Sequence, residues 1–167
     1  MKYLLDTNIF IEAKNRYYGL DFCPAFWDWL IEKNAAGTLA SIEKVANEIA
    51  NGSDELSEWV EARGKQFFLP ADQAVLPALG EVSTWASTQN YEPAAIATFL
   101  DIADSLLVAH ARAHSYTVVT HERLGDSPKK IKIPNACLAL SIPCINPFEM
   151  LRRERARFVL GPGRTAA

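Results

Sequence analysis

The sequence has few cysteines, and none of their spacings is typical of a zinc site or a disulfide framework. Its three cysteines are Cys23, Cys137 and Cys144, an odd number without a C-x-x-C pair. This usage favours reduced thiols, as in a cytoplasmic protein, over a cross-linked secreted domain. We therefore expect a cytoplasmic chain that is held together by its own hydrophobic core.

An excess of positive charge and a long hydrophobic run are also missing. The chain has 17 Lys+Arg against 20 Asp+Glu, which gives a formal net charge of −3. Proteins that coat nucleic acid by bulk charge usually have a pI above about 9, so this class is disfavoured and only a local basic patch remains. No apolar run approaches the roughly 20 residues that span a bilayer, and no signal-peptide core follows Met1. We expect no membrane partner.

The length and composition are those of one globular domain. The chain has 167 residues, of which 49% are hydrophobic and 22% charged, and a chain of this size buries enough surface to fold without a structural metal. We expect the domain to cover residues 1–160. Residues 161–167 are rich in Gly, Pro and small residues, so we expect a flexible tail there.

Short apolar runs alternate with helical patterns along the chain. The runs predict strands at residues 2–5, 38–40, 66–69, 116–119 and 143–145. The helical patterns cover residues 9–14, 23–34, 42–50, 54–62, 72–89 (with a break near Pro77 or Gly80), 102–114, 135–140 and 147–160. This order predicts an α/β fold with a central parallel sheet of about four or five short strands, covered by helices on both faces.

Polar side chains follow two of the predicted strands. Asp6 and Asn8 come directly after the first strand, and Thr120 and Glu122 follow the strand at 116–119. In open α/β sheets, ligands bind at the carboxyl ends of the strands, so these residues are candidates for chemistry. An Asp after a strand is equally often a turn former or a helix cap, and this alternative stays open for Asp6.

Two more segments carry acids that could reach the same place. Asp101 and Asp104 are three residues apart at the start of the clearest predicted helix, where they could bind a cation or cap the helix with Asp101 as N-cap. Glu48 lies about 60° from Val45 around the helix at 42–50, at the border of its apolar stripe. It either points into a crevice or is an ordinary surface glutamate.

Four motifs in order carry a family resemblance. They are L-L-D-T-N at residues 4–8, V-A-N-E-I at 45–49, A-D-S-L-L-V-A-H-A at 103–111 and V-V-T-H-E at 118–122. Together they resemble the PIN-domain superfamily of metal-dependent ribonucleases, most closely a bacterial, VapC-like branch of largely uncharacterised members. The resemblance spans roughly residues 2–150 and implies a PIN-like three-layer fold.

The resemblance also implies roles for individual residues. Asp6, Glu48 and Asp104 match the three core acids of PIN domains, and Glu122 lies where many of them have Asp, so these four are the expected catalytic and metal-binding residues. The extra methylene of Glu122 leaves open whether it binds metal directly or through water. Asn8, Asp101 and Thr120 are expected to position the metal-binding acids or the substrate without binding the metal themselves.

The chemistry of four acids supports a hard cation. Mg²⁺ and Mn²⁺ prefer oxygen ligands, and two ions about 3.5–4 Å apart can activate water for an in-line phosphodiester displacement. We therefore expect a Mg²⁺- or Mn²⁺-dependent endoribonuclease with RNA as its substrate. By resemblance alone it is the toxin of a toxin–antitoxin pair, which allows for an antitoxin protein as partner and for a homodimer.

Two basic clusters are candidates for contact with the RNA backbone. They comprise Lys129, Lys130 and Lys132 after Glu122, and Arg152 and Arg153 in the last predicted helix. Charge runs of this kind are more often solvated surfaces, and the arginines could instead bind an acidic partner.

Three other interpretations compete. A phosphatase of the haloacid-dehalogenase kind would use Asp6 as nucleophile, but it needs a second Asp where this chain has Asn8. A non-catalytic protein-binding module would use the acids only as caps, and it predicts no stabilisation by Mn²⁺. His110 and His114 have zinc-binding spacing without the glutamate of H-E-x-x-H, and His121 is either a substrate contact or an ordinary loop residue.

Overall fold

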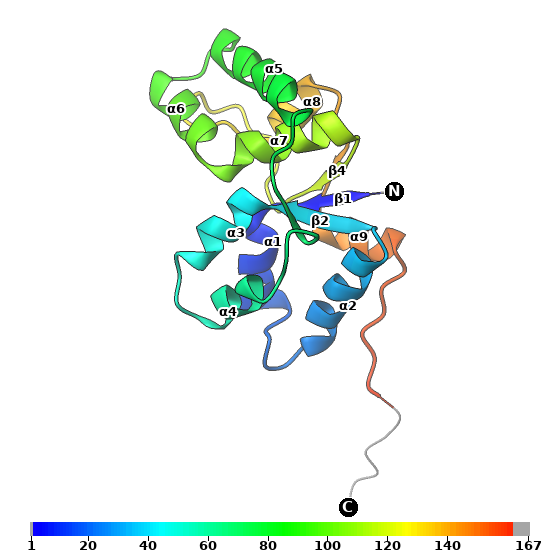
Figure 1. The fold of residues 1–167 in the computed structure, drawn as a ribbon. Coiled ribbons are helices and arrows are strands. Elements are labelled where there is room, and N and C mark those ends of the chain that lie inside the picture. The colour runs from blue at the N-terminus through cyan, green and yellow to red at the C-terminus, as the bar shows by residue number, and fades with distance from the viewer. Residues whose placement is uncertain (1, 162–167) are drawn as a thin grey trace, which may run out of the picture.

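The computed structural model describes residues 2–161, and its centre is a five-stranded parallel sheet (Figure 1). The strand order is β3-β2-β1-β4-β5, and every neighbouring pair is parallel. The strands are β1 (Tyr3–Leu5), β2 (Leu39–Ile42), β3 (Phe68–Leu69), β4 (Thr117–Val119) and β5 (Cys144–Ile145). The expected α/β fold is confirmed, while residues 162–167 of the expected tail lie outside the described residues.

The central strand is apolar at every position because it has neighbours on all sides. Leu4 and Leu5 are fully buried, and Leu4 pairs with Ala40 of β2 and with Val118 of β4. A strand that is covered on both faces gains most from a continuous apolar run. This explains why the first strand could be identified from three residues.

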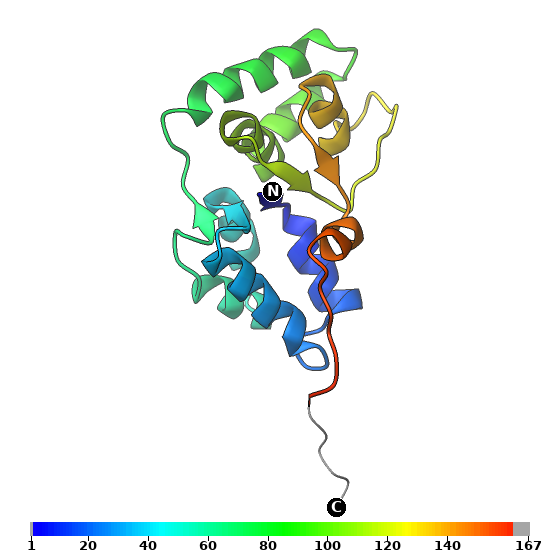
Figure 2. The ribbon, with the colours of Figure 1, turned by 90° about the vertical axis from the view of Figure 1, so that its right-hand side faces the viewer.

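Helices cover both faces of the sheet (Figures 1 and 2). One layer consists of α5 (Val75–Thr88), α6 (Pro93–Asp101), α7 (Ala103–His114) and α8 (Ile133–Ala139). The other consists of α1 (Thr7–Glu12), the π-helical turn η1 (Ala13–Tyr17), α2 (Pro24–Ala35), α4 (Glu55–Glu61) and α9 (Pro147–Arg153). Helix α3 (Glu43–Ala50) joins the two layers, because it contacts α1 and α4 as well as α7.

The strand order creates a crevice between β1 and β4. From β1 the chain continues to β2 and β3 on one side, whereas β4 and β5 add to the opposite side. The connections after β1 and β4 therefore diverge, and ligands of open α/β sheets bind at such a switch point. The backbone N–H of Asp6 donates to the carbonyl of Val119 at 3.0 Å, which places the ends of the two strands side by side.

The expected break in the helix at 72–89 is wrong. Helix α5 begins at Val75, so Pro77 falls in its first turn. The N–H groups of the first turn have no partner within a helix, so a proline there removes no hydrogen bond. Gly80 is accommodated within the helix, and α5 continues to Thr88.

The last helix is shorter than expected, and one helix was not predicted. Helix α9 ends at Arg153 instead of residue 160, and Arg155 adopts a left-handed φ of 53°, which terminates helices. The chain then extends and packs Phe158 against Tyr18 and Phe26, with ring centroids 5.7 and 6.0 Å away. Helix α6 was missed, although Pro93 at its first position is a typical start signal.

No single helix within residues 2–161 has the length and apolar character to cross a membrane. The pair formed by α6 and α7, bent by 66°, passes the same test of length and composition when the two helices are taken together.

Candidate metal centre

Asp6 is buried at the carboxyl end of β1, where it is also the N-cap of α1. One carboxylate oxygen accepts a hydrogen bond from the backbone N–H of Thr7 at 2.7 Å. The other accepts from the hydroxyl of Thr120 at 2.7 Å, and the residue is only 3% exposed. Asp6 can therefore cap α1 and belong to an acidic site at the same time.

Glu48 connects three helices. Its Oε2 accepts from the hydroxyl of Thr7 in α1 at 3.0 Å, and its Oε1 accepts from the backbone N–H of Ala103 at 2.8 Å. Ala103 is the first residue of α7, whose own N-cap residue makes no side-chain cap. Glu48 thus bonds to α1 and caps α7, a helix distant in sequence, which excludes the interpretation as an ordinary surface glutamate.

Asp104 lies in the first turn of α7, and its carboxylate accepts no hydrogen bond within the part of the chain that the structure describes. The alternative in which Asp101 caps this helix is wrong. The N-cap is Ile102, and Asp101 is the exposed last residue of α6. A role for Asp101 in orienting ligands stays a prediction.

Glu122 follows β4 and is held from two sides. Its Oε2 accepts from the backbone N–H of Ile133 at the start of α8, at 2.8 Å. Its Oε1 lies 3.2 Å from the ammonium nitrogen of Lys130. The fourth acid therefore also lies at a helix N-terminus, where the partial positive charge of the helix stabilises a carboxylate.

Burial and the charges of neighbouring acids raise the pKa values of Asp6 and Asp104. Burial and the neighbouring charges of Glu122 and Glu48 raise the pKa of Asp6 to about 7, although two hydrogen bonds to its carboxylate act the other way. Burial, followed by the charges of the other three acids, raises the pKa of Asp104 to about 8. Neutralisation of this repulsion by a cation would be favourable.

The hydroxyl of Thr120 makes three hydrogen bonds that fix the loop after β4. Besides donating to Asp6, its hydroxyl oxygen accepts from the side-chain amide of Asn8 at 3.1 Å and from the backbone N–H of Glu122 at 3.0 Å. The amide oxygen of Asn8 accepts from the N–H of His121 at 3.1 Å. Asn8 and Thr120 therefore hold the Asp6 carboxylate and the Glu122 backbone in fixed relation.

The donor set fits a hard divalent cation by its chemistry. All four candidate ligands are carboxylates, which Mg²⁺ and Mn²⁺ prefer, and the Asp104 carboxylate is free of hydrogen bonds from residues 2–161. As the side chains lie, no three His, Cys, Asp or Glu residues within residues 2–161 are arranged to hold one ion. Asp6, Glu48 and Glu122 each have both oxygens engaged, so binding of metal requires these carboxylates to change or share their partners.

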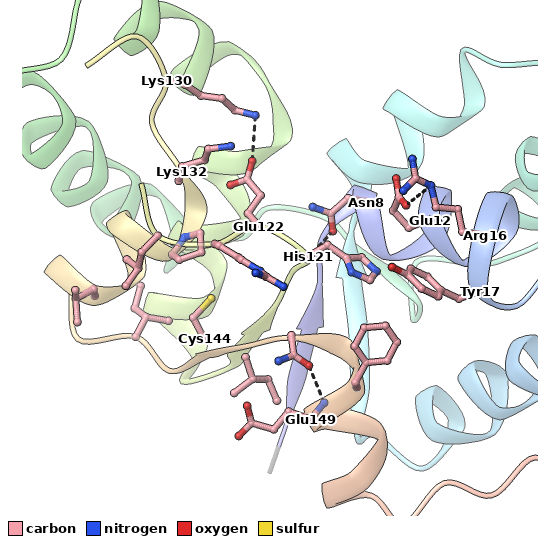
Figure 3. A pocket seen from close by; sticks show the side chains of 18 residues that line it. Asn8, Glu12, Arg16, Tyr17, His121, Glu122, Lys130, Lys132, Cys144 and Glu149 are labelled. Atoms are coloured by element: carbon pink, nitrogen blue, oxygen red, sulfur yellow. Dashed lines mark hydrogen bonds and ion pairs between the residues drawn. The ribbon is translucent and has the colours of Figure 1, made fainter. Parts of the chain in front are cut away.

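A pocket of about 930 Å³ opens beside Glu122, whereas Asp6, Glu48 and Asp104 do not line it (Figure 3). Glu122 and Asn8 lie in its wall, together with Lys130 and Lys132 from the first predicted basic cluster. Lys129, Arg152 and Arg153 do not line it, and Arg153 forms an ion pair with Glu149. The structure therefore brings part of one basic cluster to the acids.

Sequence reasoning missed several residues at this site. Thr7 bonds to Glu48 although only its neighbours were singled out, and its place within L-D-T-N was the available signal. Tyr17, Arg123 and Phe148 line the pocket and come from three separate segments. Nothing in the local pattern around them indicates that they meet.

Comparisons with known proteins bear on the fold. A family model described as "Domain of unknown function (DUF4411)" matches residues 3–158, and no curated protein matches the sequence. The structure of VapBC2 from Rickettsia felis bound to a promoter DNA fragment is similar to this chain at a TM-score of 0.54 and 18% identity, covering 87% of this chain and 98% of the other. FitAcB from Neisseria gonorrhoeae is similar at a TM-score of 0.52 and 23% identity, with the same coverage. These likenesses show that the chain shares its fold, a parallel sheet covered by helices, with these two structures.

The raised pKa values predict how stability without metal depends on pH. The folded state keeps protons on Asp6 and Asp104 at pH values where the unfolded chain has released them. The binding of these two protons therefore contributes fully to the free energy of unfolding below about pH 4. This contribution is lost as the pH rises through about 7 and 8. In EDTA at pH 8, we expect Asp104→Asn to be more stable than wild type by about 1–2 kcal/mol. The difference stays this small because the carboxylates of wild type can move apart and so relieve part of their repulsion. Near pH 4, the two proteins should be equally stable.

Urea denaturation at both pH values measures this difference. A variant that is less stable than wild type by more than about 1 kcal/mol at pH 8 would show that Asp104 is a purely structural residue of the first helical turn.

A second prediction concerns the contribution of the Thr120 hydroxyl to stability. Thr120 is 1% exposed. Thr120→Val keeps the shape but removes the hydroxyl that serves Asp6, Asn8 and Glu122. Loss of these partners leaves buried polar groups unsatisfied, so we expect a loss of about 2–3 kcal/mol at pH 7 in denaturant unfolding. Thr120→Ser retains the hydroxyl and is the matched control. Equal stability of the Val and Ser variants would mean that the hydroxyl holds nothing together.

Proposed function

Since the chain belongs to the DUF4411 family, a domain of unknown function, we propose from its acidic centre that it is a divalent-metal-dependent endoribonuclease. The observation that carries the proposal is the convergence of four carboxylates from four segments at the β1–β4 crevice, where Asp6 and Asp104 have raised pKa values. A pocket lined by Glu122, Lys130 and Lys132 adjoins this group. Burial of like charges costs stability, and a bound cation would neutralise that repulsion.

Asp6 and Asp104 are the residues that we assign to direct metal binding, with Glu48 and Glu122 completing the donor set. When bound, Mg²⁺ or Mn²⁺ supplies an activated water and stabilises the charge of a phosphodiester under attack. Thr120 and Thr7 hold the two oxygens of Asp6 in place. Lys130 and Lys132 in the pocket wall provide positive charge for the RNA phosphates.

The biological role that we propose is that of a toxin in a toxin–antitoxin pair. Its support is the VapC-like pattern of the sequence and the shared fold with VapBC2, which was crystallised with promoter DNA, and with FitAcB. An antitoxin protein is then the expected partner, and a homodimer is compatible with the same role.

A non-catalytic protein-binding module is the second candidate, and one observation favours it. Leu124 and Leu138 line the pocket although they are 61% and 71% exposed, which gives a protein partner apolar surface to cover. The phosphatase alternative has less support. The position that needs a second acid holds Asn8, whose amide is engaged with Thr120 and His121.

The proposal predicts metal-dependent cleavage of RNA. Purified wild type should gain thermal stability in Mn²⁺ and cleave single-stranded RNA, and both effects should be lost in Asp6→Asn and Asp104→Asn because each removes a ligand. Asp28→Asn, at an exposed position of α2, is the control for loss of one negative charge. Melting curves and gel analysis of labelled RNA, each with Mn²⁺ and with EDTA, provide the readouts. Stabilisation by Mn²⁺ without cleavage of any RNA would contradict the nuclease, and absence of both would favour the binding module.

The toxin role predicts growth arrest on expression in a bacterial host. Wild type and Asp28→Asn should arrest growth, whereas Asp104→Asn, expressed to the same level on an immunoblot, should not, because arrest depends on the acidic centre. If Asp104→Asn is as toxic as wild type, the arrest has another cause and the toxin role is wrong.

A further inference from the structure

Three aromatic rings from distant segments meet at one end of the pocket. The rings of Tyr17 and His121 are stacked with centroids 5.5 Å apart and an interplanar angle of 15°. The ring of Phe148 meets both at its edge, 5.2 Å from Tyr17 and 5.8 Å from His121. All three residues line the pocket, and Figure 3 shows Tyr17 and His121 side by side on the side where Asn8 lies.

The Tyr17 side chain is exposed although its backbone is fixed. It ends the π-helical turn η1, in which the N–H of Tyr18 donates to the carbonyl of Ala13 at 2.7 Å, so that the last turn contains one extra residue. The neighbouring Tyr18 is anchored, because Trp27 Nε1 donates to its carbonyl at 2.6 Å and its ring stacks on Phe26 at 4.4 Å. Tyr17 itself is 41% exposed, so part of its ring is open to a ligand.

The aromatic group is tied to the acids by a short series of hydrogen bonds. The N–H of His121 donates to Asn8, the amide of Asn8 donates to Thr120, and Thr120 donates to the carboxylate of Asp6. The His121 backbone is therefore held at a fixed position relative to Asp6. A ligand that stacks on these rings has its neighbouring groups next to the carboxylates.

The charges of the pocket wall are compatible with a polyanion. The glutamates of the wall are each ion-paired: Glu12 with Arg16 at 3.2 Å, Glu122 with Lys130 at 3.2 Å, and Glu149 with Arg153. Arg123 and Lys132 line the same wall. The pocket thus combines flat apolar rings with cations, as in sites for unpaired nucleotides.

We propose that Tyr17, His121 and Phe148 form a binding subsite for one unpaired nucleobase of the RNA, beside the acidic centre. Bases in a duplex have their faces covered by their neighbours, so only a splayed base of a single strand can stack on a protein ring. The subsite therefore selects single-stranded RNA and sets which phosphate lies at the carboxylates. This inference rests on the proposed nuclease function, and its test separates the two.

The test uses the Asp104→Asn protein in EDTA, which prevents cleavage, and a short single-stranded RNA that contains the fluorescent base 2-aminopurine. Stacking on an aromatic ring quenches this fluorescence, and anisotropy of an end label gives the dissociation constant. We expect quenching on binding, and we expect Tyr17→Ala to abolish it and to weaken binding roughly tenfold. Tyr17→Phe, which keeps the ring, should restore both.

Phe22→Ala is the matched control, because Phe22 is an aromatic residue that is 67% exposed and does not line the pocket. It should bind RNA as tightly as the parent. The same RNA annealed to its complement should bind more weakly and without further quenching of the 2-aminopurine fluorescence. This second measurement needs no substitution of an aromatic residue, so it stays decisive if Tyr17→Ala does not fold.

The outcomes separate the subsite from the proposed nuclease function. Quenching that depends on Tyr17 supports the subsite even if wild type cleaves no RNA, in which case only the nuclease proposal fails. Cleavage by wild type together with equal affinity and unchanged fluorescence in Tyr17→Ala overturns the subsite and leaves the nuclease intact. Equal quenching by single-stranded and duplex RNA also overturns it.

Discussion

Repulsion among buried carboxylates is opposed in this protein by the N-termini of three helices. Asp6 caps α1, Glu48 accepts from the first N–H of α7, and Glu122 accepts from the first N–H of α8. Each of these N–H groups lacks a partner within its helix and carries partial positive charge. The acids therefore satisfy the helix ends while the helix ends hold the acids in place. Both requirements are met at one edge of the sheet.

The strand order explains why this can happen only between β1 and β4. Parallel strands end at the same edge of the sheet, and the change of direction at β1 separates the connections that would otherwise fill the crevice. Helix α3 completes the site from outside the sheet because it contacts both helical layers. The full burial of Leu4 and Leu5 fixes the position at which Asp6 emerges, so the hydrophobic pairing of the central strand and the location of the acids have the same origin.

Most features with a local cause could be predicted from the sequence, although α6 was missed despite the start signal of Pro93, whereas features with a tertiary cause could not. The buried strands are short apolar runs, and the border position of Glu48 follows from helical periodicity, so both could be derived from neighbouring residues. The end of α9 depends on the packing of Phe158 against Tyr18 and Phe26, which no local pattern reveals. The π-helical turn that presents Tyr17 and the meeting of its ring with His121 have no signal in the sequence either.

The acidic centre and the aromatic group share the loop after β4, and this has a consequence for how they act. Thr120 bonds to Asp6 and Asn8, and Asn8 in turn holds the backbone of His121. A base stacked on the rings, as proposed, would restrict this loop, and Asn8 and Thr120 link the loop to the Asp6 carboxylate. A cation bound as proposed would compete with Lys130 and Ile133 for Glu122, the residue next to His121. If both proposals hold, we therefore expect the ligand that binds first to order this loop and so to lower the entropic cost of binding the second.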